Sequence, residues 1–110
     1  MKKTDKFELK LKYGSVPGCA FRPARYRDNG NLALQIENAD GPVCTCTVNP
    51  GEKLGDDVLC VKDYSENQGM AAFLRSMGIV GECVQVIPSG WVDLKVVELT
   101  EQGKELFKGV

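Results

Sequence analysis

The chain has 110 residues, of which 43% are hydrophobic and 26% are charged, and its net charge is −1. This length fits one domain that buries enough apolar surface to form its own core. The composition excludes the disordered and collagen-like classes, and no apolar run is long enough to span a bilayer. We expect a single domain over residues 1–110, and a cytoplasmic location because residues 1–14 lack the apolar stretch of a signal peptide.

Charge is divided unevenly along the chain. Residues 1–27 contain eight Lys and Arg against two Asp and Glu, whereas residues 28–110 contain six against thirteen. A basic segment suits nucleic acid or an acidic protein surface, but an acidic remainder repels a phosphate backbone. The charge pattern therefore leaves both kinds of partner open.

The first predicted strand is residues 7–13, FELKLKY, in which apolar and charged side chains alternate. Its buried face is predicted to hold Phe7, Leu9, Leu11 and Tyr13, and its exposed face Glu8, Lys10 and Lys12. The glycines and proline of GSVPG, residues 14–18, predict a loop. A second extended segment is expected over residues 20–27.

The next signal is Asn-Gly between two alternating runs, RYRDNGNLALQI, which predicts a hairpin. A two-residue turn at Asn-Gly would bury Arg25 and Arg27 among aliphatic side chains. A three-residue loop at residues 28–30, with Gly30 left-handed in a bulge, instead sets Tyr26 opposite the first leucine of the next strand. We expect the three-residue loop, because it keeps both arginines in water.

A turn at ENADGP leads to a strand over residues 43–48, and a loop then leads to residues 58–61, VLCV. That run is apolar on both faces, which favours an interior strand. The period then changes to that of a helix, with Met70, Phe73, Leu74 and Met77 on one stripe. Ser65 and Gln68 have the spacing of a capping box, and Gly78 stands where a left-handed helix cap is expected.

A second hairpin is predicted in CVQVIPSGWVDLKV, with residues 88–90 as its three-residue loop. Its buried face is predicted to hold Val84, Val86, Val92, Leu94 and Val96. LTEQGKELFKG predicts a short helix capped by Thr100. The predicted fold is α+β, a mainly antiparallel sheet of six to seven strands with one packed helix and a short C-terminal helix.

Five segments stand in a distinctive order: DNGNLALQI, DGP followed by TVNP, KDYSENQGM and PSGWV. This order resembles a small uncharacterised bacterial and phage family, domain of unknown function 4313, over about residues 20–97. The resemblance implies an α+β domain and a phage or mobile-element context, without an agreed activity or cofactor. In that family, small or aliphatic residues are usual where this chain has Cys44 and Cys46.

The chain has five cysteines and no histidine. An odd count without a secretion signal predicts reduced thiols rather than a disulfide framework. Cys44 and Cys46 are expected to share the inward face of a strand, with Thr45 and Thr47 on the outward face. Core packing is the simplest interpretation; a metal or redox pair is the alternative, but a zinc knuckle needs wider spacing and further ligands.

Residues for catalysis are scarce in the sequence. Histidine, the usual base near neutral pH, is missing, and there is no Gly-rich phosphate loop or nucleophile elbow. Only Cys19, near Arg22, has a cation close in sequence that lowers a thiol pKa. We therefore expect no enzymatic activity, no metal and no cofactor.

Two surfaces are candidate binding sites. Lys10, Lys12, Arg25 and Arg27 form one cationic surface if their strands are neighbours, although charged outer faces also serve simply to keep sheet edges soluble. Trp91 is expected to face outward and to pair across the hairpin with Ile87, as an anchor for a protein partner. The alternative is that the C-terminal helix covers Trp91.

The leading functional hypothesis is a small non-enzymatic binding protein of a phage or mobile element. Its sharpest form is an inhibitor of a host defence complex, in the manner of anti-CRISPR proteins, acting by protein–protein contact. The alternative is a nucleic-acid-binding accessory protein that uses the basic N-terminal strand and hairpin. No membrane partner is expected, and the sequence does not specify an oligomeric state.

Overall fold

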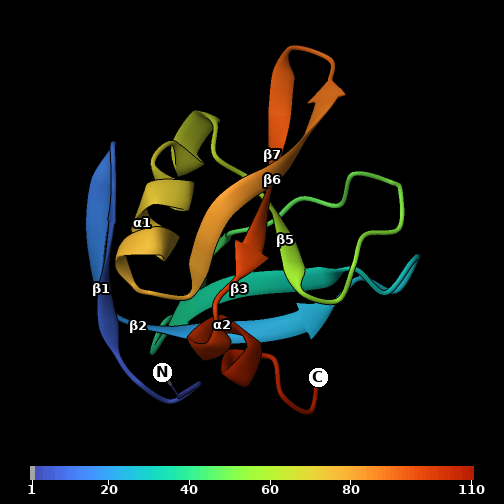
Figure 1. Ribbon diagram of the computed structural model, residues 1–110. Helices are drawn as coiled ribbons and strands as arrows, with labels where there is room; N and C mark the ends of the chain where they lie inside the picture. Colours follow the sequence, from blue (N-terminus) through green and yellow to red (C-terminus); the bar gives the residue numbers. More distant parts are fainter. Residues whose placement is uncertain (1) are drawn as a thin grey trace.

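The computed structural model describes residues 2–110, which form an α+β fold with seven strands in two antiparallel sheets (Figure 1). The first sheet has the order β1-β2-β3-β4, with bounds Phe7–Leu11, Gly14–Arg25, Leu32–Asn38 and Gly41–Thr45. The second has the order β5-β7-β6, with bounds Val58–Val61, Val92–Leu99 and Val80–Ser89. The helical elements are η1 (Ser65–Asn67), α1 (Met70–Ser76) and α2 (Glu101–Leu106). The predicted α+β class is confirmed, with the strands divided between two sheets.

β2 belongs to both halves of the first sheet because it bends at Pro17 and Gly18. Its first half pairs with β1 as far as Cys19, and its second half pairs with β3 from Ala20 onward. The register against β1 shifts at this point, and Gly18 has a φ of +67°. Proline cannot donate to the ladder and glycine accepts a left-handed conformation, so the pair forms a bulge that bends the strand. The loop predicted at residues 14–18 is therefore wrong.

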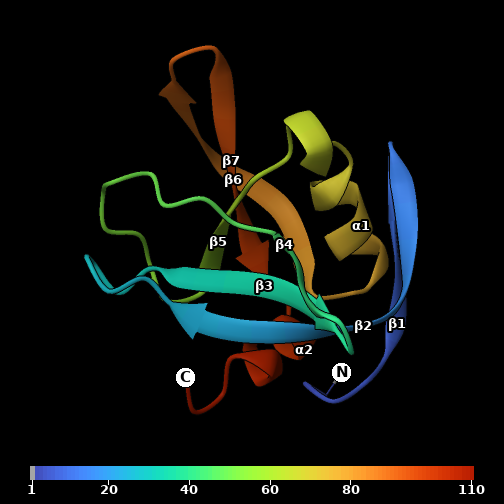
Figure 2. The ribbon, with the colours of Figure 1, turned by 180° about the vertical axis from the view of Figure 1, so that it is seen from behind.

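The bend sets β1 at a steep angle to β3, as Figures 1 and 2 both show. β1 ends at Leu11, which pairs with Gly14, so Tyr13 lies in a two-residue turn. Leu9 is buried as predicted, but Tyr13 is 68% exposed. The predicted inward orientation of Tyr13 is wrong because the strand ends before reaching it.

The main core lies between the two sheets and includes the apolar stripe of α1. Met70, Phe73 and Leu74 are buried in it, which confirms the predicted helix. The predicted capping box is wrong: Ser65 belongs to η1, and Asp63 Oδ1 accepts the hydrogen bond of the Gly69 amide at 2.8 Å. An acidic side chain thus serves the first turn of the helix, where the helix dipole favours it.

The predicted C-terminal end of α1 and the predicted N-terminal cap of α2 are both confirmed. Gly78, just after α1, has a φ of +78°. At α2, Thr100 Oγ1 accepts a hydrogen bond from the Gly103 amide at 3.1 Å. α2 buries Leu106 and Phe107 in the main core at the C-terminal end of β7. No helix within residues 2–110 has the length and apolar character needed to cross a membrane.

A short crossing segment, residues 46–48, joins the two sheets by backbone hydrogen bonds. The amide of Cys46 donates to the carbonyl of Leu34 in β3 at 2.8 Å. The amide of Val48 donates to the carbonyl of Cys60 in β5 at 3.0 Å. Bonds to both sheets from residues only two positions apart hold the sheets at a defined separation.

Thr47 lies in the middle of the crossing segment and is only 3% exposed. Its Oγ1 accepts from the amide of Leu34 at 3.1 Å and lies 3.1 Å from the hydroxyl of Tyr26. The predicted outward orientation of Thr47 is wrong, because its bridge to Val61 places it between the sheets. A buried hydroxyl is tolerated there because its hydrogen bonds are made.

β5 lies at an edge of the second sheet rather than in its interior, which corrects the prediction. Leu59, Cys60 and Val61 are nevertheless all buried. The apolar character that suggested an interior strand arises because the crossing segment covers the free edge of β5. An edge covered in this way is protected from pairing with another chain.

The β2–β3 hairpin differs from its predicted register by one residue. Arg25 pairs with Leu32, so the loop comprises residues 26–31. The amide of Tyr26 donates to the carbonyl of Asn31 at 2.9 Å, which closes the loop. Gly30 has the predicted left-handed conformation, with a φ of +75°. The predicted three-residue loop is wrong because Asn31 turns inward and extends it.

Substitution of Thr47 by valine tests the crossing segment. Valine keeps the shape of the side chain but leaves the Leu34 amide and the Tyr26 hydroxyl without their partner. We expect the free energy of unfolding in urea to fall by about 1–3 kcal/mol. The control is Thr45→Val, since the Thr45 hydroxyl makes no hydrogen bond among residues 2–110, and we expect a change within about 0.5 kcal/mol. Equal losses in both variants would contradict this role for Thr47.

Candidate functional site

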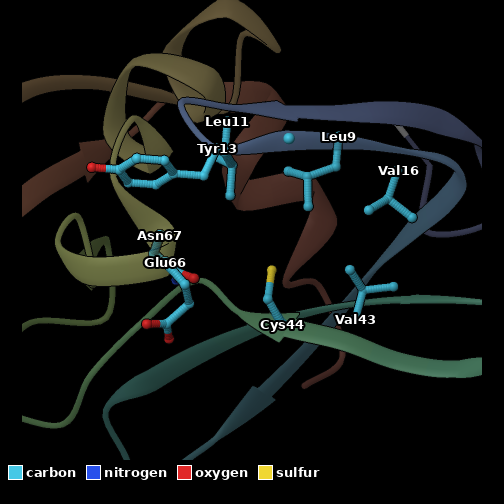
Figure 3. Close-up of a pocket in the computed structure, with 9 residues that line it drawn as sticks. Leu9, Leu11, Tyr13, Val16, Val43, Cys44, Glu66 and Asn67 are labelled. Atoms are coloured by element: carbon cyan, nitrogen blue, oxygen red, sulfur yellow. The ribbon is translucent and has the colours of Figure 1, made fainter.

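A groove lies between β1 and β4, the two edge strands of the first sheet (Figure 3). The bend in β2 turns β1 toward β4, so the two edges face each other. Leu9 and Leu11 lie on one side of the groove, and Val43 and Cys44 lie on the other. The groove has a volume of about 240 Å³.

Cys44 and Cys46 both contact the main core, but their surroundings differ. Cys46 is fully buried in the core, whereas Cys44 is half-buried and lines the groove. A hydrogen bond from the Cys46 thiol, with a smaller effect from the Lys62 cation, lowers the pKa of Cys44. Burial, together with that same hydrogen bond, raises the pKa of Cys46 well above its ordinary value. Cys46 is therefore a core residue, whereas Cys44 packs against the core and also lines the groove.

The other cysteines have separate surroundings. Cys19 and Cys60 are buried, and burial raises the pKa of Cys19 and raises that of Cys60 to about 11. Cys83 is exposed on β6. Within residues 2–110, no group of three or more His, Cys, Asp or Glu side chains is arranged to hold a metal ion.

The four basic residues proposed as one surface are not brought together. Lys10 pairs with Ser15 in the first half of β2, whereas Arg25 ends the second half. The bend of β2 lies between them, so the pair Lys10 and Lys12 is separated from Arg25 and Arg27 by the length of the strand. A continuous cationic surface across all four residues is not formed.

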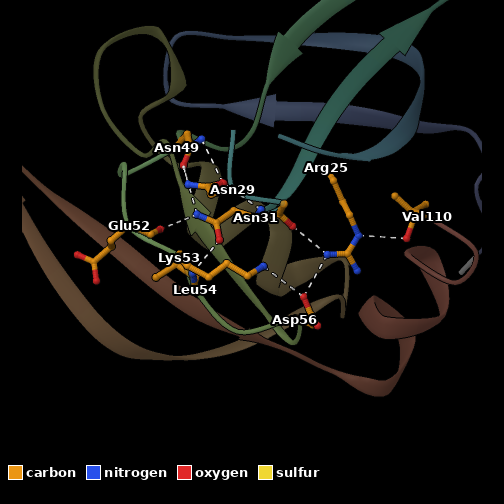
Figure 4. A network of polar contacts seen from close by, with 10 residues as sticks. Arg25, Asn29, Asn31, Asn49, Glu52, Lys53, Leu54, Asp56 and Val110 are labelled. Atoms are coloured by element: carbon orange, nitrogen blue, oxygen red, sulfur yellow. Dashed lines mark hydrogen bonds and ion pairs between the residues drawn. The ribbon is translucent and has the colours of Figure 1, made fainter. Parts of the chain in front are cut away.

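Arg25 is held by the polar network shown in Figure 4. Its Nη1 donates to the carbonyl of Gly30 at 2.9 Å and to Asp56 Oδ1 at 3.1 Å, and its Nε donates to the carbonyl of Val110 at 3.1 Å. The hydrogen bond from Arg25, aided by the charge of Lys53, lowers the pKa of Asp56. Arg25 therefore joins the hairpin loop to two distant segments, and its Nε and Nη1 donors are already used.

Asn31 is the buried centre of this network, at 2% exposure. Its Oδ1 accepts from the amide of Leu54 at 2.7 Å, and its Nδ2 donates to the carbonyl of Glu52 at 2.8 Å and to Asn49 Oδ1 at 3.2 Å. Sequence reasoning treated the Asn-rich stretch as turn chemistry and missed this role. The only signal was an asparagine directly before a strongly apolar strand.

The β6–β7 hairpin projects beyond the rest of the molecule as an arm (Figures 1 and 2). Ser89 pairs with Val92, so Gly90 and Trp91 form a two-residue turn. Gly90 has a φ of +59°, which a turn of this length requires at one of its central positions. Trp91 stands at the tip and is fully exposed, at 102%.

The predicted pairing of Trp91 with Ile87 across the hairpin is wrong. Ile87 pairs instead with Leu94 and packs inward, against a small second core that contains Leu94 and Val96. The three-residue loop was wrong because glycine takes the first position of a tighter turn. The C-terminal helix does not cover Trp91, since α2 packs at the other end of β7.

The same change of register places two further apolar side chains outside. Val86 pairs with Lys95 on the outer face, and Val84 lies at the second of two register shifts of β6, between Cys83 and Gln85. They are 52% and 55% exposed, respectively, although both were predicted to be buried. A register change by an odd number of residues reverses the faces of a strand. We call Val84, Val86 and Trp91 the hairpin patch.

Comparisons with known proteins give no relative for this chain: no family model, no curated protein and no solved structure matches it.

The polar network predicts a large effect of Asn31→Ala on stability. The substitution leaves the buried Leu54 amide without its acceptor and removes the donor to the Glu52 carbonyl. We expect the free energy of unfolding to fall by about 2–4 kcal/mol, measured by urea denaturation. Gln35→Ala, at an exposed position of the next strand, is the control, with an expected change within about 0.5 kcal/mol. A similar small change for Asn31→Ala would show that the network does not stabilise the fold.

Proposed function

We propose that this protein acts by binding another protein through the hairpin patch, without catalysis. The observation that carries the proposal is the fully exposed Trp91 at the tip of the projecting arm. Tryptophan is among the side chains that contribute most to protein interfaces, and grouped exposed apolar side chains are typical of binding surfaces.

The energetics support a contact centred on Trp91. A tryptophan that becomes buried removes about 150–250 Å² from water, which corresponds to about 4–6 kcal/mol before the entropic costs of association. Val84 and Val86 add apolar area on the same arm. The free protein gains no packing from Trp91, and about half of each valine side chain stays exposed, so this exposure favours a role in binding over a role in stability.

The motif order over residues 20–97 supports a finer form of the proposal. In a phage or mobile element, the partner would be a host defence complex that this protein inhibits by occluding it. An arm that reaches beyond the compact body suits occlusion, because it presents its apolar tip to a recess in a larger partner. This form rests on the family resemblance as well as on the arm.

Trp91 is the sole tryptophan of the chain, so its fluorescence reports directly on the patch. In the free protein we expect the emission of a fully hydrated indole, and we expect a shift to shorter wavelength when a purified partner binds. Trp91→Ala should weaken binding at least about tenfold while leaving the urea midpoint unchanged. The matched control is Tyr13→Ala, which removes an exposed aromatic on a different strand turn. Equal binding by wild type and Trp91→Ala would contradict the proposal.

Nucleic-acid binding by the basic N-terminal strand is the competing function, and its best support is that Lys10 on β1 and Lys12 in the turn after β1 are exposed. If it holds, affinity for an oligonucleotide falls steeply with salt, and each Lys→Glu change at these positions lowers the salt slope by about 1. Arg27→Glu is the suitable hairpin variant, because Arg25→Glu also breaks the polar network. Binding that is unaffected by salt and by these variants excludes this function.

A further inference from the structure

The groove between β1 and β4 has the dimensions and lining of a small ligand site. Its volume of about 240 Å³ lies between the ~150 Å³ cavity that holds benzene and the ~300 Å³ at which drug-sized pockets begin. Leu9, Leu11, Val16 and Val43 supply apolar walls. An apolar ligand of modest size fits this space.

Polar groups around the groove are largely engaged with one another. Asn67 Nδ2 donates to the carbonyl of Thr45 at 2.7 Å, and Glu66 accepts from Lys62 at 2.6 Å. The Tyr13 hydroxyl donates to Gln68 Oε1 at 3.3 Å. The site therefore recognises a ligand through apolar contact and through its one reactive group, the thiol of Cys44.

The surroundings of Cys44 favour a nucleophilic thiolate. Its sulfur points into the groove, and the neighbouring Cys46 thiol lowers its pKa, whereas the charge of Lys62 is largely offset by its ion pair with Glu66 at 2.6 Å. Reactive cysteines are partly exposed and lie beside groups that lower the thiol pKa. Cys46 and Cys19 are buried, and burial raises the pKa of both thiols, so neither shares these properties.

We infer that the groove and Cys44 form a covalent binding site for a small α,β-unsaturated carbonyl compound that carries an alkyl chain. The Cys44 thiolate adds to the β-carbon, and a new C–S bond forms as the carbon–carbon π bond opens. The resulting enolate takes a proton from water, which replaces the proton that the thiol released. The addition has no leaving group and needs no oxidant. The alkyl chain lies against the leucines and valines of the groove.

This inference is independent of the hairpin patch. The groove belongs to the first sheet, whereas the patch lies on β6 and β7 of the second sheet. Loss of partner binding in Trp91→Ala and loss of ligand capture at Cys44 are therefore separate outcomes.

The test compares N-ethylmaleimide with N-octylmaleimide on the folded, reduced protein, and mass spectrometry measures the rate at each cysteine. Cys83, exposed outside the groove, is the internal control. We expect the octyl-to-ethyl rate ratio at Cys44 to exceed that at Cys83 by at least about tenfold, because the longer chain buries more methylene groups. In urea-unfolded protein the two ratios should converge. Equal ratios at Cys44 and Cys83 in the folded protein would overturn the proposed site.

Two variants separate the groove from the thiol. Val43→Thr keeps the volume of the wall but makes it polar, and it should reduce the octyl-to-ethyl ratio at Cys44. Cys46→Ala removes the donor and should move the pH–rate profile of Cys44 to higher pH while the chain-length ratio stays high. A profile that does not move would overturn the role of the thiol pair. Circular dichroism and the urea midpoint confirm that each variant is folded.

Discussion

The crossing segment is the constraint on which the rest of this structure depends. Cys46 bonds to β3, Val48 bonds to β5, and the hydroxyl of Thr47 lies between them. Because the donors and acceptors come from adjacent residues, the two sheets cannot slide without breaking several buried hydrogen bonds at once. The main core fills the separation that this segment defines, and the helices complete it.

Both candidate sites take their positions from this arrangement. At one end, the segment follows directly after β4, whose Cys44 lines the groove. At the other, it covers β5, which in turn pairs with residues 95–98 of β7. The remaining part of the β6–β7 hairpin extends past the end of β5, so its tip pairs only with itself. The arm therefore arises because β6 and β7 are longer than β5, which the crossing segment holds in place.

Much of the fold could be predicted from the sequence because its signals are local. Alternation, helical period and capping chemistry identified most of the strands, the stripe of α1 and the Thr100 cap. Both hairpin registers were wrong by an odd number. In the β2–β3 hairpin the turn length depends on contacts made far along the chain, those of Asn31 with residues 49–54, and in the β6–β7 hairpin Gly90 takes the first position of a tighter turn. Gly103, unusual inside a helix, has a reason visible only in three dimensions: a Cβ there would overlap the carbonyl oxygen of Ile79.

The surroundings of Cys44 and Cys46 could not be predicted from the local sequence. Spacing of two along a strand predicted that Cys44 and Cys46 share a face, but β4 ends at Thr45, and the spacing did not predict what each thiol meets. The bulge at Pro17 and Gly18 decides this, because it turns β1 toward β4 and opens the groove over Cys44 alone. A thiol in the core and a thiol at a ligand-sized groove are thus only two positions apart in the sequence. Their chemistry is set by a bend in a strand more than twenty residues earlier.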